Sequence, residues 1–456
     1  LLMMLFLIAF SFIRSIIYER KTNHQQVVNA IARDHVQAQT LLMPFIVVPM
    51  TTTQACDNDN KKDCSYRQQM IILSKTGAWQ NKMLVDNQSF KRGIYRAISY
   101  QNKVQITGRF ELPTELLNPQ ANQRVDWNEA SLRFYMSDMR GLKNQPIFNY
   151  QQQALSLDFP KQEGANPLIM PYTQLLLKDL LTKPQFNFSL DVEMAGTSSL
   201  QILPLGQDVA VTVQANWPDA SFFGESLPHK QLNNKDFKAD WQNTFLSNRN
   251  GQILASCFLA EPEACSQLQK VFFRHQYLNN AHAGEAGIAQ QAVGGFGVSF
   301  IQAVDVYLMT ERAVKYALLF LVITFGSFFL FEILKGMAVH PVQYSLVGAA
   351  LAVFYLLLLS FSEHIAFSYA YLIASIACIV LISFYVSFVL KSLKHATLFF
   401  TILTLMYSTL FVILQSEDTT LVLGAILLFV LLATMMFLTR HVDWYNLKQS
   451  KDNSSL

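Results

Sequence analysis

Two long apolar runs joined by three residues constrain this chain more than any other feature. Residues 342–361 and 365–390 flank Ser362-Glu363-His364 within the stretch 340–392. As helices rising about 1.5 Å per residue, each run is long enough to cross a hydrocarbon core of about 30 Å. Lipid offers no hydrogen-bonding partners, so the backbone of such runs must be satisfied within helices. The pattern predicts a transmembrane helical hairpin, and therefore an integral membrane protein.

Apolar residues are unevenly spread and divide the chain into four regions. The chain is 51% hydrophobic and 15% charged, against about 25% charged in an ordinary soluble domain. Residues 1–17 are predicted to form an N-terminal transmembrane anchor, and 18–315 a large domain outside the membrane. Residues 316–438 are predicted to form a five-helix transmembrane bundle, and 439–456 a cytoplasmic tail. The first segment has no small-x-small cleavage site, which favours an uncleaved anchor over a signal peptide.

Strict alternation of apolar and polar residues marks the middle of the large domain. Residues 103–112 (KVQITGRFEL) and 186–194 (FNFSLDVEM) place apolar side chains on one face, and 209–215 repeat the pattern. A period of two with one polar face is typical of antiparallel sheet covered on one side. We therefore predict one large, mostly antiparallel-β, sandwich-like domain. Two smaller domains that meet near Asn250-Gly251 are the alternative.

Local signals predict turns and helices around these strands. Residues 100–103 are expected to form a hairpin turn, and Pro44 is expected to end the helix that continues from the anchor. Helices are expected at 172–182 and 262–273. Gly294-Gly295-Phe296-Gly297 lacks the spacing of a phosphate-binding loop, which favours a hinge or bend before the membrane bundle. Four tryptophans are expected in the sheet core rather than on a sugar-binding platform: Trp79, Trp127, Trp217 and Trp241.

Five apolar runs follow the large domain, and with the N-terminal anchor they predict six membrane-spanning helices. The runs cover approximately 316–334, 342–361, 365–390, 396–414 and 420–438. Lys and Arg gather in alternate loops and in the tail, whereas 362–364 and 415–419 contain neither. Short basic loops stay in the cytoplasm. Both termini are therefore predicted to be cytoplasmic, with the large domain on the outer side of the membrane.

Cysteine positions give an independent indication of the compartment. Cys56 and Cys64 bracket DNDNKKD, Cys257 and Cys265 bracket FLAEPEA at the same separation, and Cys378 lies within a membrane run. Four cysteines outside the membrane allow three pairings, and the equal short gaps favour the two local disulfides. Disulfides persist in oxidising compartments, in agreement with an outer location. Four free thiols in a reducing compartment are the alternative.

Three ionisable residues within or beside membrane runs are the candidate functional positions. Glu332 lies within a run, which suggests an ion or proton relay, although Lys335 could pair with it as a purely structural partner. Glu363 and His364 lie at the outer end of the central hairpin. A carboxylate beside an imidazole could act as a general base or as a pH-sensitive contact. The alternative is the polar tip that any membrane hairpin needs.

Common catalytic motifs are missing from the sequence. It contains no HExxH, CxxC or GxSxG, which removes the usual zinc, thiol-redox and hydrolase patterns. We therefore predict no catalytic, metal-binding or cofactor-binding residues and no cofactor. The net charge of +3 forms no basic tract, so nucleic acid is not an expected partner. The expected partners are the lipid bilayer and a periplasmic or membrane protein of unknown identity.

Several blocks of sequence together resemble one family of bacterial membrane proteins. They are 39–49 (QTLLMPFIVVP), 134–142 (FYMSDMRGL), 216–228 (NWPDASFFGESLP), 297–315 (GVSFIQAVDVYLMTERAVK), 340–344 (HPVQY), 356–367 (LLLLSFSEHIAF), 370–375 (AYLIAS) and 439–445 (TRHVDWY). In these blocks the chain resembles the inner-membrane CreD family, also called cell envelope integrity proteins. It departs from the family pattern at Met43, at Asp219-Ala220 and at Ala303.

The resemblance implies an inner-membrane protein with a large periplasmic domain and no assigned catalytic residues. It also implies a gene in a two-component regulon, linked to envelope integrity and to tolerance of envelope stress such as colicins and β-lactams. We expect a non-enzymatic cell envelope integrity factor whose periplasmic domain binds an envelope partner. One alternative is a transporter, or a protein that handles lipid or cell-wall substrates through the helix bundle. Another is an envelope-acting enzyme at the outer membrane face, near Glu363 and His364.

Overall fold

The chain forms two compact units in the computed structural model. The structure describes residues 2–55, 63–160, 166–178, 183–244, 249–259, 261–273, 294–300, 306–335, 340–389, 393–415 and 420–440. One unit, here called the helical unit, comprises Leu1–His24 and Val304–Leu456, and the other, the β unit, comprises Gln25–Ala303. Helix α1 (Leu2–Asp34) contributes residues to both.

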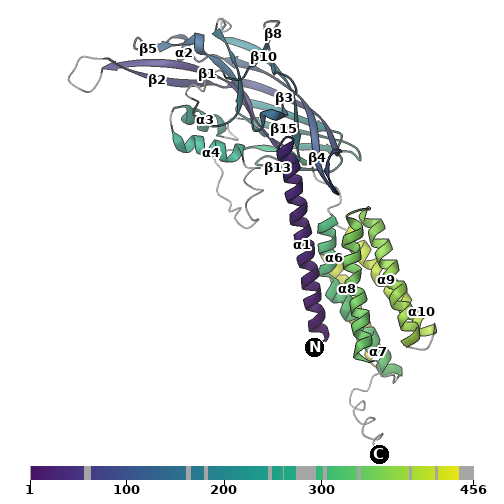
Figure 1. Cartoon of the computed structure of the whole chain (residues 1–456). Helices are drawn as coiled ribbons and strands as arrows, with labels where there is room; N and C mark the ends of the chain where they lie inside the picture. The colour runs from purple at the N-terminus through teal and green to yellow at the C-terminus, as the bar shows by residue number, and fades with distance from the viewer. Residues whose placement is uncertain are drawn as a thin grey trace, which may run out of the picture. The chain divides into compact units, whose positions relative to one another are not determined.

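The β unit contains two eight-stranded sheets (Figure 1). Sheet A has the order β13-β16-β11-β1-β6-β9, with β2 and β5 also paired to β1. Its strands are β1 (Gln39–Ala55), β2 (Asp63–Ile72), β5 (Gln123–Val125), β6 (Ser131–Met136), β9 (Tyr172–Leu176), β11 (Ser199–Leu203), β13 (Ala220–Gly224) and β16 (Phe296–Phe300). Strands β1 and β11 run parallel.

Sheet B has the order β14-β15-β12-β3-β4-β10-β7-β8. Its strands are β3 (Ser74–Arg92), β4 (Tyr95–Glu111), β7 (Ile147–Tyr150), β8 (Gln153–Ser156), β10 (Gln185–Thr197), β12 (Asp208–Ala215), β14 (His229–Leu232) and β15 (Phe237–Thr244). Strands β3 and β12 run parallel, so both sheets are mixed rather than purely antiparallel.

The two sheets pack face to face around one hydrophobic core. Trp241 of sheet B stacks on Phe296 of sheet A with ring centroids 5.2 Å apart, and Tyr100 packs against Phe300 at 5.5 Å. Trp79 is buried with Trp241, and Trp127 and Trp217 pack against the same cluster, as predicted. The three alternating segments are confirmed as parts of β4, β10 and β12, and the apolar residues of 186–194 are all buried.

Two local predictions in the sheet region are wrong. The turn between β3 and β4 lies at Gly93-Ile94 rather than at 100–103, because Gly93 adopts a φ of +63° that favours glycine. Tyr100 lies inside β4, where its hydroxyl donates to the Ser199 carbonyl at 2.8 Å. The helix expected at 172–182 begins instead as strand β9, because Tyr172 and its neighbours pair with β6.

Two predicted chain breaks also lie elsewhere. Helix α1 ends at Asp34, and Pro44 lies within β1 at a register shift between Leu42 and Phe45, where its missing N–H is tolerated. Phe296 and Gly297 of the glycine-rich segment begin strand β16, and Gly294 and Gly295 directly precede it, so the segment leads into sheet A rather than forming the predicted hinge. A Cβ on Gly297 would lie 2.1 Å from the Leu200 carbonyl oxygen, so the glycine permits close strand packing.

Short helices complete the β unit. They are α2 (Thr114–Leu117), α3 (Asn250–Phe258) and α4 (Pro262–Phe272), with single 3₁₀ turns at Trp127–Glu129 and Met139–Gly141. The prediction of a helix at 262–273 is confirmed by α4. Asn250 is buried and its amide donates to the carbonyls of Pro204 and Gly294. These bonds fix α3 to the sandwich, so the described residues place no domain joint at Asn250.

A buried carboxylate fixes the end of α1 to sheet A within the β unit. The Asp138 carboxylate accepts bonds from the Gln37 N–H at 3.0 Å and from the Arg140 guanidinium at 2.6 and 2.9 Å. Arg140 also donates to the Arg33 carbonyl in the last turn of α1, at 2.6 Å. Burial by itself would raise the pKa of Asp138, but the bonds from Arg140 and from the Gln37 and Arg140 backbone N–H groups outweigh it and lower the pKa.

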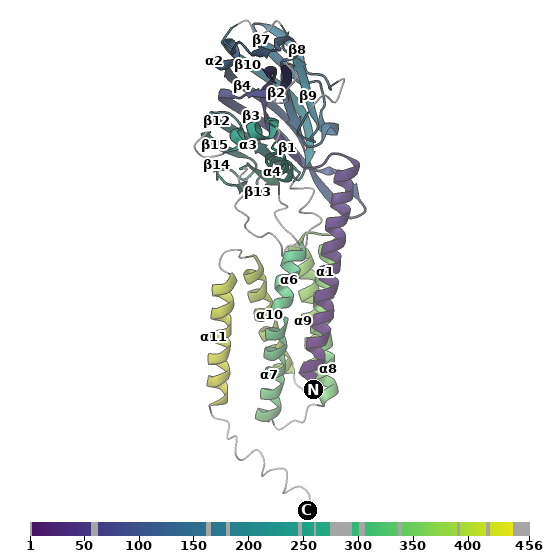
Figure 2. The ribbon, with the colours of Figure 1, turned by 90° about the vertical axis from the view of Figure 1, so that its left-hand side faces the viewer.

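Among the described residues, six helices of the helical unit follow the β unit: α6 (Val306–Lys315), α7 (Ala317–Lys335), α8 (Pro341–Ser362), α9 (Phe367–Val389), α10 (Leu393–Gln415) and α11 (Thr420–Thr439). Helix α7 continues end to end from α6, α8 lies beside both, α9 lies beside α8, and α10 lies beside α9 (Figure 2). Phe6, Phe10, Ile13 and Ile17 of α1 pack into their core, and a Cβ on Gly348 would meet the Phe6 ring. The sequence prediction included residues 306–315, which form α6, in the outer domain. In the structure, α6 belongs to the helical unit.

Three helical segments among the described residues are long and apolar enough to cross a membrane: α8, α9 and Thr397–Gln415 of α10. Helix α6 and Ala317–Phe329 of α7 meet at a bend of 41° and make a fourth if they form one span. The predicted hairpin is present, since α8 and α9 flank the 363–366 turn. The count of six spans stays a prediction.

The lowered pKa of Asp138 predicts how stability depends on pH. A carboxyl whose pKa is lower in the folded state stabilises the fold above its unfolded pKa of about 3.9 and loses that contribution as the pH falls below it. We expect Asp138→Asn to destabilise the β unit by about 2 kcal/mol at pH 7, because charge-assisted bonds are lost. It should also weaken the acid dependence of the unfolding midpoint, measured between pH 3 and 8.

The matched control for this prediction is Asp208→Asn, which changes an exposed carboxylate at the start of β12. It should leave the unfolding midpoint and its pH dependence unchanged. Equal midpoints for Asp138→Asn and the wild type at pH 7 would contradict the proposed role of the Asp138 bonds.

Candidate functional site

Local sequence defines both ends of α8, the first helix of the hairpin. At the start of α8, the His340 ring accepts a bond from the Val342 N–H and the Gln343 side chain accepts one from the His340 N–H, which forms a capping box ahead of Pro341. The apolar run then continues to Ser362, whose hydroxyl donates back to the Leu359 carbonyl at 2.9 Å. Glu363 follows as the C-cap residue of α8.

Glu363 is surrounded by residues from distant parts of the helical unit. The Tyr307 hydroxyl of α6 donates to one of its carboxylate oxygens at 3.1 Å, and Arg20 of α1 lies 3.8 Å from the other. The Glu363 side chain is only 7% exposed, whereas that of Arg20 is 50% exposed. His24 of α1 also packs on the Tyr307 ring, with centroids 5.5 Å apart. Glu363 therefore connects α1, α6 and the α8–α9 turn, and its partners could not be recognised from local sequence.

His364 does not share these partners. Its ring Nδ1 lies 3.1 Å from the Ser360 carbonyl oxygen, one helical turn earlier, and the residue is exposed. No hydrogen bond or ion pair joins the His364 ring to the Glu363 carboxylate in the described part of the chain. This geometry argues against a carboxylate–imidazole pair. Instead, Glu363 connects neighbouring helices, and His364 lies at the exposed tip of the hairpin.

The remaining sequence candidates are only partly described. Glu332 lies in the last turn of α7, but the described side chains of this helix end before it. Cys257 and Cys265 form a disulfide between α3 and α4. Cys64 lies in β2 and is disulfide-bonded, whereas Cys56 lies outside the described residues, so their predicted pairing stays a prediction. Cys378 is a buried free thiol in α9.

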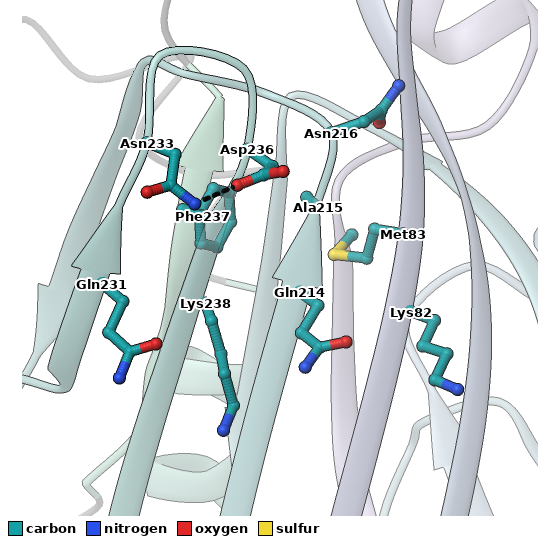
Figure 3. A pocket seen from close by; sticks show the side chains of 10 residues that line it. All are labelled: Lys82, Met83, Gln214, Ala215, Asn216, Gln231, Asn233, Asp236, Phe237 and Lys238. Carbon is teal, nitrogen blue, oxygen red and sulfur yellow. Dashed lines mark hydrogen bonds between the residues drawn. The ribbon is translucent and has the colours of Figure 1, made fainter.

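A groove on sheet B is a site that sequence analysis missed (Figure 3). It has a volume of about 450 Å³ and lies over β3, β12, β15 and β14. Figure 3 shows Gln231, Lys238, Gln214 and Lys82 side by side on these four strands, with the Asn233 amide donating to Asp236 at one end. A second hollow of about 190 Å³ shares Lys82 and Met83 with the groove and continues over β4 and β10.

One row of register partners runs through both hollows and is here called the lysine row. Its members follow one another across six adjacent strands: Gln231, Lys238, Gln214, Lys82, Lys103 and Glu193. Neighbouring strands lie about 4.8 Å apart. Alternation in the segments that form β4, β10 and β12 indicated a polar face but could not give the register that aligns these residues.

The lysine row contains three lysines and a single acidic residue, Glu193, so its net charge is positive. Lys103 pairs with Glu193 at 3.2 Å, and Lys238 pairs with Asp240 at 3.3 Å. Among the described residues, no carboxylate oxygen lies within 4 Å of the Lys82 ammonium, which is exposed and directly opposite Lys103. Like charges opposite each other on adjacent strands are destabilising. The row is therefore an arrangement that an anionic group would stabilise.

Among the described residues, no group of three His, Cys, Asp or Glu side chains could hold a metal ion.

The apolar α8–α9 hairpin and its neighbouring helices are joined in one chain to a large β-rich unit. This combination defines a class, membrane proteins with a large β domain. The chain belongs to the family described as inner membrane protein CreD, whose family model matches residues 1–445. It is 29% identical over 462 residues to the inner membrane protein CreD of Escherichia coli (strain K12), covering 99% of this chain and 93% of that protein. The resemblance found in the sequence blocks is confirmed.

The Glu363 contacts predict a specific loss of stability. Tyr307→Phe removes the hydroxyl that bonds a nearly buried carboxylate, so we expect the helical unit to lose about 1.5–3 kcal/mol. Glu363→Ala should also destabilise it by leaving the Tyr307 hydroxyl without this acceptor. The measurement is the thermal unfolding midpoint of the purified full chain in detergent.

The control is His364→Ala, which changes the exposed neighbour and should shift the midpoint by less than about 0.5 kcal/mol. If Tyr307→Phe were as stable as the wild type while His364→Ala was destabilised, the assignment of Glu363 as the structural tie would be wrong.

Proposed function

We propose that this chain is a non-enzymatic cell envelope integrity factor of the inner membrane, whose β unit lies in the periplasm and binds an envelope partner. The observation that carries this proposal is the groove on sheet B, because it is a recess lined by polar and charged side chains from four adjacent strands of the β unit. Family membership supports the location in the inner membrane. Membrane helices that hold a binding domain are suited to keeping an envelope partner close to the bilayer.

A role without catalysis is supported by the geometry of the sequence candidates. Glu363 is engaged by Tyr307 and lies near Arg20, and His364 is bonded to its own helix. A general base needs its acceptor within hydrogen-bond reach of a substrate proton. The carboxylate with the clearest partners is nearly buried, which favours a structural role over an enzymatic one.

The orientation is supported by charge and by disulfide chemistry. Lys391, Lys394 and Arg440 gather in alternate connections and in the tail, which favours cytoplasmic termini. The Cys257–Cys265 disulfide fits a β unit in an oxidising compartment. Both arguments agree with a periplasmic β unit.

The orientation predicts the redox state of this pair in living cells. Cells are treated with a membrane-permeant alkylating reagent, the chain is purified, and newly modified cysteines are counted by mass spectrometry before and after reduction. We expect Cys257 and Cys265 to be modified only after reduction. A Cys257→Ser variant is the control, because it should expose Cys265 to alkylation without reduction. Modification of both wild-type cysteines before reduction would place the β unit in a reducing compartment.

The partner-binding role predicts that charge reversal in the groove impairs envelope protection. Cells that lack the native gene are complemented with wild type, Lys82→Glu or Lys91→Glu, and survival under colicin or β-lactam stress is compared at equal protein levels. We expect Lys82→Glu to lose protection. Lys91→Glu makes the same charge change at an exposed position of β3 outside both hollows and should keep it. Full protection by Lys82→Glu would count against the groove as the functional site.

A further inference from the structure

We propose that the lysine row binds an acidic peptide segment, with a carboxylate of the peptide at Lys82. This inference rests on the proposed binding role of the β unit and names the chemistry of its partner. The row supplies ammonium groups and primary amides, the adjoining hollow adds one exposed apolar side chain, and each of these groups selects a different part of the ligand.

Positive charge selects an anion at the centre of the row. Lys238 and Lys103 each have a carboxylate partner within 3.3 Å, whereas Lys82, between them in the register, has none within 4 Å among the described residues. An incoming carboxylate would pair with Lys82 and offset its repulsion with Lys103. A lysine ammonium is a point charge without the planar fork of arginine, so it accepts an anion in several orientations.

Amide side chains select a ligand that both donates and accepts hydrogen bonds. Gln214 and Gln231 are exposed and flank Lys238 in the row. A glutamine amide carries two N–H donors and a carbonyl acceptor, which matches the alternating N–H and C=O groups of a peptide backbone. A ligand that lies across the strands would pass one side chain of the lysine row about every 4.8 Å.

The surrounding surface favours a peptide over a sugar polymer. Phe237, the aromatic residue that lines the groove, is only 2% exposed, so its ring offers no face for stacking a sugar. In the adjoining hollow, Leu84 is 65% exposed two residues beyond Lys82 on β3. An apolar side chain of the ligand, next to its carboxylate, would cover Leu84. The chemistry of the site therefore fits an acidic peptide that also carries apolar residues.

The test uses the purified full chain in detergent and a fluorescein-labelled octapeptide of alternating glutamate and alanine. Binding is followed by fluorescence anisotropy at low and at moderate salt. We expect saturable binding that weakens as salt rises. Lys82→Glu should weaken it at least tenfold, whereas Lys91→Glu should change it less than twofold. Circular dichroism of both variants establishes that the β unit remains folded.

Two further probes separate the classes of ligand. A neutral octapeptide, with glutamine in place of glutamate, should bind at least tenfold more weakly than the acidic one. Oligogalacturonate, a carboxylated sugar polymer, should also bind more weakly. Tighter binding of oligogalacturonate, equal binding of the neutral peptide, or equal binding by wild type and Lys82→Glu would each overturn the proposal.

Comparison with the survival assay keeps the two proposals distinct. If Lys82→Glu loses envelope protection although the wild type does not bind the acidic peptide, the groove is functional and the ligand class is wrong. If Lys82→Glu loses peptide binding but protects cells fully, the acidic-peptide site stands and its role in envelope protection fails.

Discussion

Strand β1 is the element on which the β unit depends. Every residue from Gln39 to Met50 is buried, and the strand is bonded on one edge by β11 and β2 and on the other by β6 and β5. Such a strand cannot shift without breaking ladders on both edges. It begins five residues after α1 ends. Asp138 bonds to Gln37 in the short connection, and Arg140 bonds to Arg33 in the last turn of α1. The end of α1 is therefore fixed by a strand that is itself fixed by four others.

The sequence predicted what depends on local periodicity and missed what depends on register. The central membrane hairpin and the faces of β4, β10 and β12 follow from residue spacing, since both periods are local. The turn predicted at 100–103 was wrong because β4 begins at Tyr95, before its alternating part. Gly93, which has a positive φ, was the residue that could have indicated the true turn. Glu363 was singled out by its position at the hairpin, but its partners Tyr307 and Arg20 lie in α6 and α1, far from it in the sequence. The lysine row needed the pairing of six strands, which no single segment contains.

Two of the blocks that carry the family resemblance contain residues with structural roles in this chain. His340 and Gln343 cap α8, and Asp138 and Arg140 connect α1 to sheet A. The lysine row lies outside these blocks, on strands whose sequences did not contribute to the resemblance. The proposed partner site therefore rests on the register of sheet B and not on the blocks that carry the resemblance.

The position of β16 has a consequence for how the chain is made. This strand lies between β13 and β11, so sheet A is incomplete until residues 296–300 have been synthesised. Until then β13 lacks its ladder partner and Trp241 lacks the Phe296 ring. Pairings between segments so far apart close slowly, and unpaired edges invite aggregation. In the described ladders, β13 and one edge of β11 therefore stay unpaired until nearly the last residues of the β unit have been synthesised.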